Sequence, residues 1–176
     1  MPILKWEEIL REVAFQKYSR KIEKVIYWLP DGRKSDFYIK KEGNPVCILP
    51  ITKDNKVILA RQFRPGPNEI LLELPGGGRE EGETPRQAAE RELLEETGYK
   101  GNFQLVTQVF DCAYSTAHRY CFVATDCEKI SEQKLDQNEY AEIVLLPLDR
   151  FRQLLRSGKM TDVEIGYLGL DFLGLL

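Results

Sequence analysis

The chain has 176 residues, of which 43% are hydrophobic and 30% charged, and its formal net charge is −3. This composition is ordinary for a globular protein, and the length predicts one domain or one domain with a small N-terminal extension. A chain of this size buries enough surface to be stable without disulfides or a structural metal. The absence of a basic excess argues against nucleic acid as the main partner.

The cysteines and the two ends of the chain bear on its location. None of the four cysteines lies in a CxxC pair, and the chain begins without the pattern of a signal segment. Both features favour a reducing, cytoplasmic setting with thiols as small core residues. The apolar C-terminal segment from Ile165 to Leu176 contains three glycines and Asp171. It is too short to span a bilayer, so we expect no membrane association and predict a docked helix there.

Residues 1–45 are predicted to form the N-terminal extension. The apolar spacing between Trp6 and Phe15 predicts a short amphipathic helix. Two strands are then expected, Ile22–Trp28 and Phe37–Ile39, around a turn at Pro30–Gly32.

Residues 46–176 are predicted to form the main domain. Strands are expected at Val46–Ile51, Val57–Phe63, Ile70–Leu74, Phe103–Phe110, Tyr120–Ala124 and Glu142–Leu146. A helix is expected from Thr84, as N-cap with Pro85 behind it and Gln87 completing a capping box, to Thr97 before Gly98. Further helices are expected over Leu148–Arg156 and at the C-terminus. Strands dominate the middle and helices flank them, which predicts an α/β sandwich.

The helix after Thr84 carries an unusual cluster of acids. Glu92, Glu95 and Glu96 are three and four residues apart, so they share one side of the helix. Like charges at these spacings, and anions in the last helical turn, both destabilise a helix. A divalent cation would offset this repulsion, and oxygen ligands suit Mg²⁺ with Mn²⁺ as a substitute. The alternative is a solvated charged surface of a helix.

The spacing around these acids resembles a complete Nudix box. Gly77 is followed after five residues by Glu83, and after seven more by the run from Arg91 to Tyr99, which reads RELLEETGY. The last position is usually aliphatic, so Tyr99 is a mild variation. The resemblance implies a Nudix hydrolase: an α/β/α sandwich with a mixed sheet, here with a small N-terminal β extension.

The resemblance also implies roles for residues of the box. In that family, residues matching Glu92 and Glu96 hold magnesium, Glu95 often assists, and the carbonyl of the residue matching Gly76 often binds metal as well. The residue matching Glu83 supports the site, and the one matching Arg91 orients the glutamates. The reaction is attack of water on one phosphorus of a nucleoside diphosphate that is linked to another group.

A narrower resemblance lies outside the box. The runs RQFRP, from Arg61 to Pro65, and ELPGG, from Glu73 to Gly77, are similar to the ADP-ribose pyrophosphatase and nucleotide-sugar branch. Arginine suits bidentate contact with a diphosphate, so Arg64 is the candidate substrate contact. Arg61 is a second candidate, for which a solvent-facing strand position is the favoured interpretation. Glu139 matches the glutamate that this branch carries on a loop as general base, with an ordinary loop acid as the alternative.

The same branch implies a homodimer that exchanges N-terminal strands, with aromatic residues from the extension contacting the base. Trp28 is the candidate for such stacking, although packing is the more common role of one aromatic residue. The run Ser115–Ala117 departs from the Ser-Pro-Gly common in ADP-ribose enzymes, which leaves other nucleoside diphosphate sugars open. Further alternatives are a nucleoside triphosphate or dinucleoside polyphosphate substrate and, less favoured, a non-catalytic ADP-ribose sensor.

Overall fold

The computed structural model describes residues 3–135, 137 and 139–176, which form two compact units. The first unit comprises residues 1–44 and 110–118, and the second unit comprises residues 45–109 and 119–176. Residues 110–118 were expected in the main domain. Long-range backbone hydrogen bonds join them to this unit: the N–H of Lys40 donates to Tyr114 O (2.8 Å), and the N–H of Thr116 donates to Lys40 O (3.0 Å).

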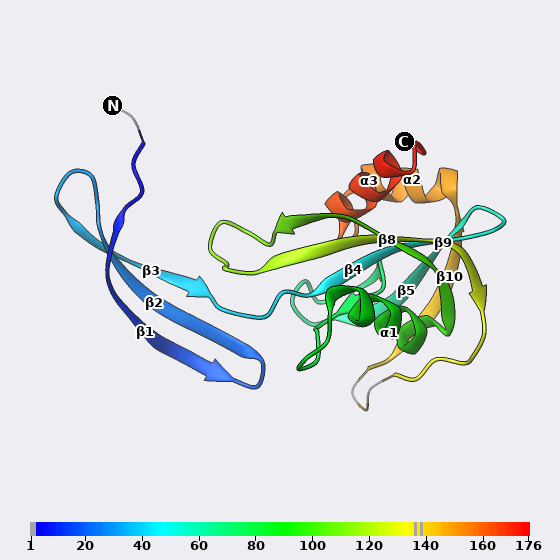
Figure 1. The fold of residues 1–176 in the computed structure, drawn as a ribbon, viewed down its shortest axis with the longest axis horizontal. Helices are drawn as coiled ribbons and strands as arrows, with labels where there is room; N and C mark the ends of the chain where they lie inside the picture. The colour runs from blue at the N-terminus through cyan, green and yellow to red at the C-terminus, as the bar shows by residue number, and fades with distance from the viewer. Residues whose placement is uncertain (1–2, 136, 138) are drawn as a thin grey trace. The chain divides into compact units, whose positions relative to one another are not determined.

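The first unit is built on an antiparallel sheet of three strands in the order β1-β2-β3 (Figure 1). Its strands are β1 (Glu7–Lys17), β2 (Arg20–Trp28) and β3 (Lys34–Lys40). The helix predicted over Trp6–Phe15 is therefore wrong. The pairing of β1 with β2 skips Ile9 and Ala14, and each such bulge shifts the inward and outward alternation by one residue. Two bulges in one strand give an apolar spacing that imitates a helix.

The second unit contains a mixed sheet with the strand order β10-β5-β4-β9-β8. Strand β4 runs parallel to β9 and antiparallel to β5, while β6 pairs with β5 and β7 with β4. The last residue of β8, Phe110, and the first residue of β9, His118, are assigned to the first unit. The strands are β4 (Val46–Thr52), β5 (Lys56–Arg64), β6 (Glu69–Glu73), β7 (Gly76–Gly77), β8 (Tyr99–Phe110), β9 (His118–Lys129) and β10 (Ala141–Pro147).

Helices cover both faces of this sheet. The helices are α1 (Pro85–Thr97), α2 (Leu148–Ser157) and α3 (Val163–Phe172). Strand β4 is buried along its whole length and alternates between two cores. Val46 and Ile48 pack with residues of α1, whereas Cys47, Leu49 and Ile51 pack with residues of α2 and α3. The expected α/β/α sandwich with a mixed sheet is confirmed, with α1 on one side and α2 and α3 on the other (Figure 1).

Helix α1 begins and ends where the sequence predicts. Thr84 is the N-cap, and Thr84 and Gln87 form a complete capping box. At the other end, Gly98 has a left-handed φ of 75°, and its N–H donates to Leu94 O (2.8 Å). A side chain at Gly98 would also collide with the carbonyl oxygen of Ser131. Both ends of the helix are therefore determined by local chemistry.

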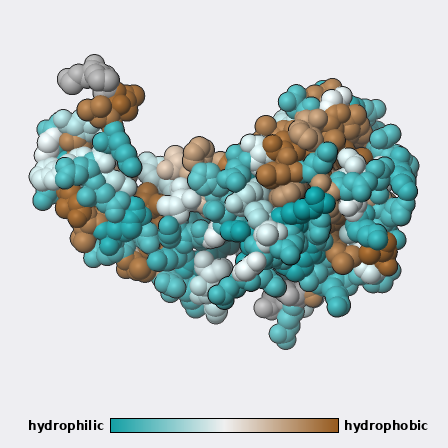
Figure 2. All heavy atoms as spheres, viewed as in Figure 1, coloured by the Kyte–Doolittle hydropathy of each residue, from teal (hydrophilic) through white to brown (hydrophobic). Residues whose placement is uncertain are grey.

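The surface of the second unit carries apolar side chains over α3 and the C-terminal residues (Figure 2). Tyr167, Phe172 and Leu176 are the exposed large apolar residues of that region. Within the described ranges, no helix has the length and apolar character needed to cross a membrane.

Candidate active site

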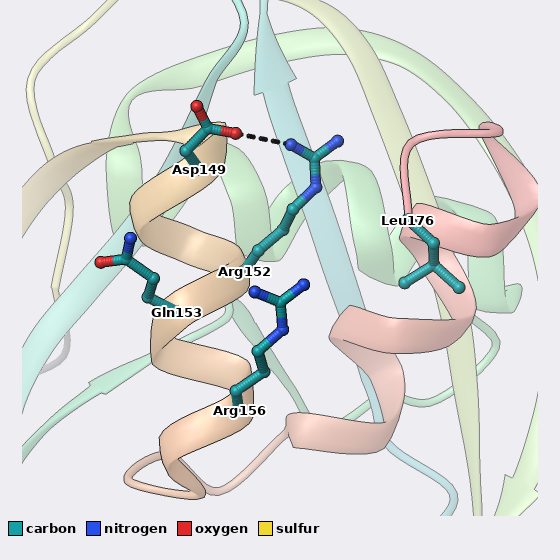
Figure 3. Close-up of a pocket in the computed structure, with 5 residues that line it drawn as sticks. All are labelled: Asp149, Arg152, Gln153, Arg156 and Leu176. Atoms are coloured by element: carbon teal, nitrogen blue, oxygen red, sulfur yellow. Dashed lines mark hydrogen bonds and ion pairs between the residues drawn. The ribbon is translucent and has the colours of Figure 1, made fainter.

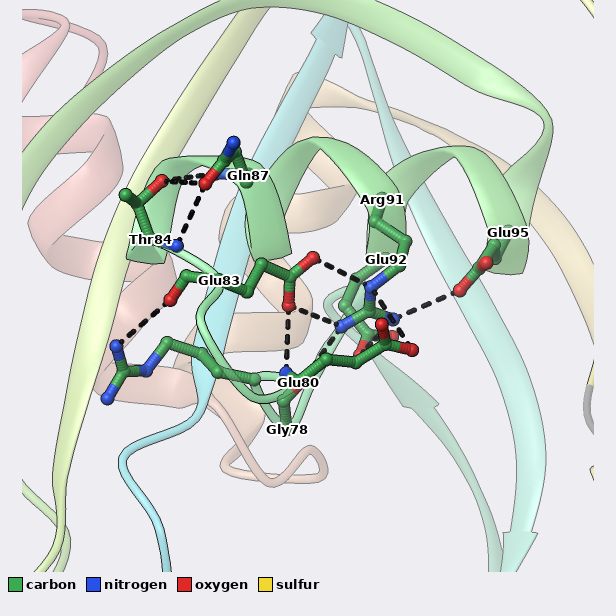
Figure 4. Close-up of polar contacts among 9 residues, drawn as sticks. Gly78, Glu80, Glu83, Thr84, Gln87, Arg91, Glu92 and Glu95 are labelled. Atoms are coloured by element: carbon green, nitrogen blue, oxygen red, sulfur yellow. Dashed lines mark hydrogen bonds and ion pairs between the residues drawn. The ribbon is translucent and has the colours of Figure 1, made fainter.

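Arg91 is the centre of a polar network that joins the loop before α1 to the acids of the helix (Figure 4). Its Nε and Nη2 donate to the two carboxylate oxygens of Glu83 (2.9 and 3.0 Å), and Nη2 also donates to Gly78 O (2.9 Å). Its Nη1 donates to Glu92 Oε1 and to Glu95 Oε2, both at 3.0 Å. Arg91 therefore fixes the loop and orients two acids of the helix. The hydrogen bonds from Arg91 also lower the pKa of Glu83.

Glu92 lies on the inner side of α1, where only 14% of its side chain is exposed. A Cβ on Gly77 would lie 2.5 Å from Glu92 Oε1, so a larger residue there would displace this carboxylate from its present position. Burial raises the pKa of Glu92, although Arg91 opposes the shift. The carboxylate is thus held close to the backbone in a setting that disfavours its charge.

Glu96 is the most strongly perturbed acid of the cluster. Its Oε2 accepts a hydrogen bond from the backbone N–H of Gly76 (2.9 Å), which favours the charged form. Burial nevertheless raises the pKa of Glu96 to about 8, and the charges of Glu92 and Glu139 add to the shift. Glu92 is paired with Arg91, whereas Glu96, one helical turn away, lies in a setting that disfavours its charge.

The segment after β9 is tied to the C-terminal end of α1. The N–H groups of Ile130 and Ser131 donate to Gly98 O, and that of Lys134 donates to Glu95 O (2.7 Å). Gln133 Nε2 donates to Glu96 O (2.6 Å), a contact that the sequence analysis did not anticipate. This anchoring brings the exposed Glu139 close enough to act electrostatically on both Glu92 and Glu96.

The two arginines of β5 have different environments. Arg64 Nε donates to Glu73 Oε2 (2.5 Å), and the charge of Arg64 acts on Glu96. Arg61 is 52% exposed and forms an ion pair with the exposed Glu142 of β10 (2.9 Å). The structure therefore brings Arg64 towards the box glutamates, while Arg61 takes part in a surface pair. The ELPGG run contains Glu73, to which the sequence pattern assigns no role.

Trp28 lies at the end of β2 in the first unit, whereas the box glutamates belong to the second unit. Its side chain is partly exposed, and Lys34 Nζ lies 4.6 Å from its ring centroid. This is the geometry of a cation–π contact. One face of the Trp28 ring is thus covered by Lys34, a residue of the same sheet.

The acids of α1 offer carboxylate oxygens as possible ligands for a metal ion. Among the described residues, no three carboxyl, thiol or imidazole groups converge as a ready ligand set. Mg²⁺, however, takes only one or two protein carboxylates and keeps water and substrate oxygens for the rest. Glu92 and Glu96 fit that donor set, with Glu95 and Gly76 beside them, and a cation would offset their unfavourable burial.

A separate depression of about 500 Å³ lies on α2 and is lined by Asp149, Arg152, Gln153, Arg156 and Leu176 (Figure 3). Its arginine Arg152 is used within the protein, because Nη1 donates to Asp149 (2.7 Å) and Nε and Nη2 donate to Leu175 O. Helix α2 covers the face of the sheet opposite to α1. This depression is therefore distinct from the acid cluster.

A comparison with protein families identifies the family to which the chain belongs. Residues 41–164 match the model of the NUDIX domain family. The chain therefore belongs to this family, and the prediction of a Nudix hydrolase is confirmed.

The chain is also similar to individual proteins of known sequence or structure. The chain is 31% identical to the ADP-ribose pyrophosphatase of Bacillus subtilis (strain 168), over 92% of this chain and 86% of the relative. It is 30% identical to the methanol dehydrogenase activator of Bacillus methanolicus, over 81% of each chain. A crystal structure of an ADP compounds hydrolase matches all of both chains with a TM-score of 0.80 at 22% identity, which shows a common fold.

Proposed function

We propose that this protein hydrolyses the pyrophosphate bond of ADP-ribose or a related nucleoside diphosphate sugar. Water is added across the bond, and the products are a nucleoside monophosphate and a sugar phosphate. The observation that carries the proposal is the pair of largely buried carboxylates, Glu92 and Glu96. The charge of Glu139 acts on both of them, and the charge of Arg64 acts on Glu96. The name of the Bacillus subtilis relative supports ADP-ribose as the first substrate to test.

The proposed cofactor is Mg²⁺, with Mn²⁺ as a substitute. Glu92 and Glu96 would hold it, assisted by Glu95 and by the carbonyl of Gly76. When bound, such a cation supplies charge neutralisation at the diphosphate and activation of water. Arg91 serves this arrangement by orienting Glu92 and Glu95 through its two 3.0 Å hydrogen bonds.

Other residues are proposed to act on the substrate and on water. Arg64 binds the diphosphate, because a guanidinium forms paired hydrogen bonds with phosphate oxygens. Glu139 takes the proton of the attacking water, which its exposed position beside the acid cluster permits. Trp28 is proposed to stack on the nucleobase. Arg61 is assigned to its surface pair with Glu142.

The first unit is proposed to mediate a homodimer. Every residue of its edge strand β1 is exposed, including Leu10, Val13 and Phe15. A long exposed edge strand with apolar side chains is suited to pairing with another chain. Sedimentation velocity of the purified protein tests the dimer. The free thiols of all four cysteines fit the proposed cytoplasmic location.

The rival proposals keep the box chemistry and change the substrate. The two relatives have different names, so family membership alone does not select one ligand. The run Ser115–Ala117 departs from the pattern of ADP-ribose enzymes, which leaves GDP-mannose, dinucleoside polyphosphates and nucleoside triphosphates as alternatives. A non-catalytic sensor is less favoured, because all the acids of the box are present.

The deciding experiment measures AMP release from ADP-ribose with Mg²⁺ by chromatography, beside a Glu96→Gln control. Release by the wild type and none by the control would support both the site and the substrate class. If the protein is folded and binds metal but releases no AMP, the assignment of ADP-ribose as substrate is overturned. The same assay with GDP-mannose and diadenosine polyphosphates would then identify the alternative substrate.

A further inference from the structure

Glu73 is a buried acid next to the candidate diphosphate contact. Its exposed fraction is 2%. Its Oε2 accepts hydrogen bonds from Arg64 Nε (2.5 Å) and from Gln62 Nε2 (2.9 Å), and its Oε1 lies 2.8 Å from Thr161 Oγ1. The hydroxyl of Thr161 also lies 3.0 Å from Asp162 Oδ2, and its single proton serves one of these acceptors at a time.

The strand register explains why these side chains meet. Glu73 on β6 pairs with Ala60 on β5, and Gln62 and Arg64 follow Ala60 at steps of two residues. Side chains two residues apart in a strand point to the same face, so all three project to one side of the sheet. Thr161 reaches them from the segment that precedes α3. Two strands and one distant segment thus converge on a single carboxylate.

A buried acid at this point has a stability cost unless it is paired and hydrogen-bonded. Among the described residues, Arg64 is the cation that forms an ion pair with Glu73. A hydrophobic residue would fill the same space without the free-energy cost of burying a charge, because replacing buried ion pairs by apolar residues is often neutral or stabilising. The presence of an acid at this position therefore indicates a role other than packing.

The contact with Glu73 leaves the two terminal guanidinium nitrogens of Arg64 available for a ligand. Only Nε is used on Glu73, and 45% of the Arg64 side chain is exposed. The four N–H groups on the two terminal nitrogens have the planar fork geometry that matches a phosphate. Fixing a long side chain before binding lowers the entropy cost of binding. Arg64 is thus oriented in advance by its Nε.

We propose that Glu73 is a positioning residue that holds Arg64 by its Nε so that the terminal nitrogens meet the diphosphate of the substrate. This inference rests on the proposed function, in which Arg64 is the diphosphate contact. Glu73 itself touches neither the substrate nor the acids of the box in this proposal. Its effect must therefore pass through Arg64, which makes it testable.

A double-mutant cycle with Glu73→Gln and Arg64→Ala tests the proposal. We expect Glu73→Gln alone to raise the KM for ADP-ribose about tenfold, with a much smaller change in kcat, because binding orientation is lost. In the Arg64→Ala background, the same change should alter KM less than about twofold. Equal effects in both backgrounds, or no effect on KM in the wild-type background, would overturn it.

Controls separate positioning from general stability. Glu128→Gln changes an exposed acid that is paired with Lys53, and its KM should equal that of the wild type. If Glu73→Gln does not fold, the Nε–H signal of Arg64 in ¹⁵N NMR of the wild-type protein, assigned by its loss in Arg64→Ala, decides the question. Slow hydrogen exchange of that signal supports a fixed contact, and exchange at the rate of a free arginine contradicts it.

The same samples distinguish this inference from the proposed function. Binding of ADP with Mg²⁺, measured by calorimetry, reports on diphosphate recognition without any turnover. Suppose that ADP-ribose is not cleaved, that Glu73→Gln weakens ADP binding about tenfold in the wild-type background, and that it weakens ADP binding less than about twofold in the Arg64→Ala background. Only the substrate assignment then fails. If ADP-ribose is cleaved and the cycle is additive, only the positioning role fails.

Discussion

Two buried acids in the second unit, Glu96 and Glu73, differ in how the protein treats their charge. Glu73 has an arginine, an amide and a hydroxyl as neighbours, all contributed by the chain. Glu96 has one backbone donor, Gly76, and two acids, Glu92 and Glu139, that raise its pKa further. The carboxylate of Glu73 is thus paired within the fold, whereas burial and two neighbouring acids disfavour the charge of Glu96.

This difference is the basis for the proposed roles, in which Glu73 positions Arg64 and Glu96 binds the cation. A carboxylate with a complete set of donors fixes its neighbours in place. A buried carboxylate with too few donors is costly for the apo protein, and a cation is the natural means to lower that cost. The predictions below test whether the two acids are divided in this way, in order of expected effect.

The largest effect is expected from Glu96→Gln. Turnover should fall by more than the 10- to 100-fold range typical for loss of an outer-shell partner of a metal, because a direct ligand is removed. The circular dichroism spectrum should stay that of the folded protein. Glu90→Gln, which changes an exposed acid of the same helix paired with Arg86, is the matched control and should keep full activity. Loss of the folded spectrum in Glu96→Gln would make this glutamate structural.

Glu139→Gln should lower kcat by about 100-fold or more, the range of general base catalysis, with a smaller change in KM. The physical reason is that the amide cannot accept the proton of the attacking water. Steady-state kinetics with ADP-ribose and saturating Mg²⁺ measure both constants. An unchanged kcat would move the role of base to Glu95.

The pH dependence of stability should reveal the unsatisfied charge of Glu96. Burial raises its pKa to about 8 from 4.5, so the folded protein binds this proton more tightly than the unfolded chain does. The stabilising contribution is complete below about pH 4.5 and is lost as the pH rises towards 8. Metal-free wild type should therefore melt at a lower temperature at pH 8 than at pH 6.

Thermal unfolding in the presence of EDTA measures this dependence. Glu96→Gln cannot ionise, so its melting temperature should fall less between pH 6 and pH 8. Added Mg²⁺ should recover the stability of the wild type at pH 8, because it binds only the folded state. Parallel pH profiles of the two proteins would mean that Glu96 ionises freely in the fold.

The smallest effect is expected from Arg61→Ala. The exposed pair of Arg61 with Glu142 contributes only about 0 to 1 kcal/mol to the free energy of unfolding, as surface ion pairs generally do. The KM for ADP-ribose should change less than about twofold, in contrast to Arg64→Ala. A tenfold rise in KM would instead place Arg61 in the substrate site.

Local chemistry explains where sequence reasoning succeeded. The start of α1 at Thr84, its end at Gly98 and the capping box with Gln87 follow from hydrogen bonds between near neighbours. The spacing of Arg91, Glu92, Glu95 and Glu96 identified the family for the same reason, because one helix presents them together. These features depend on a few consecutive residues, so tertiary contacts do not alter them.

Long-range pairing explains where sequence reasoning failed. Residues 7–17 form strand β1 because β2 supplies the hydrogen-bonding partner, and the bulges at Ile9 and Ala14 hide the alternation of a strand. Neither the pairing partner nor the bulges leave a mark in the local sequence.

The acidic helix, its glycine loop and the membership of the NUDIX family follow from consecutive residues of the chain. Which charges are compensated depends instead on contacts between distant segments. The tertiary structure pairs Arg64 with Glu73, ties the segment before Glu139 to the end of α1 through Gln133, and buries Glu96 beneath the loop at Gly76. Burial and partnership depend on residues far apart in the chain, and these two quantities determine the energy of a charge.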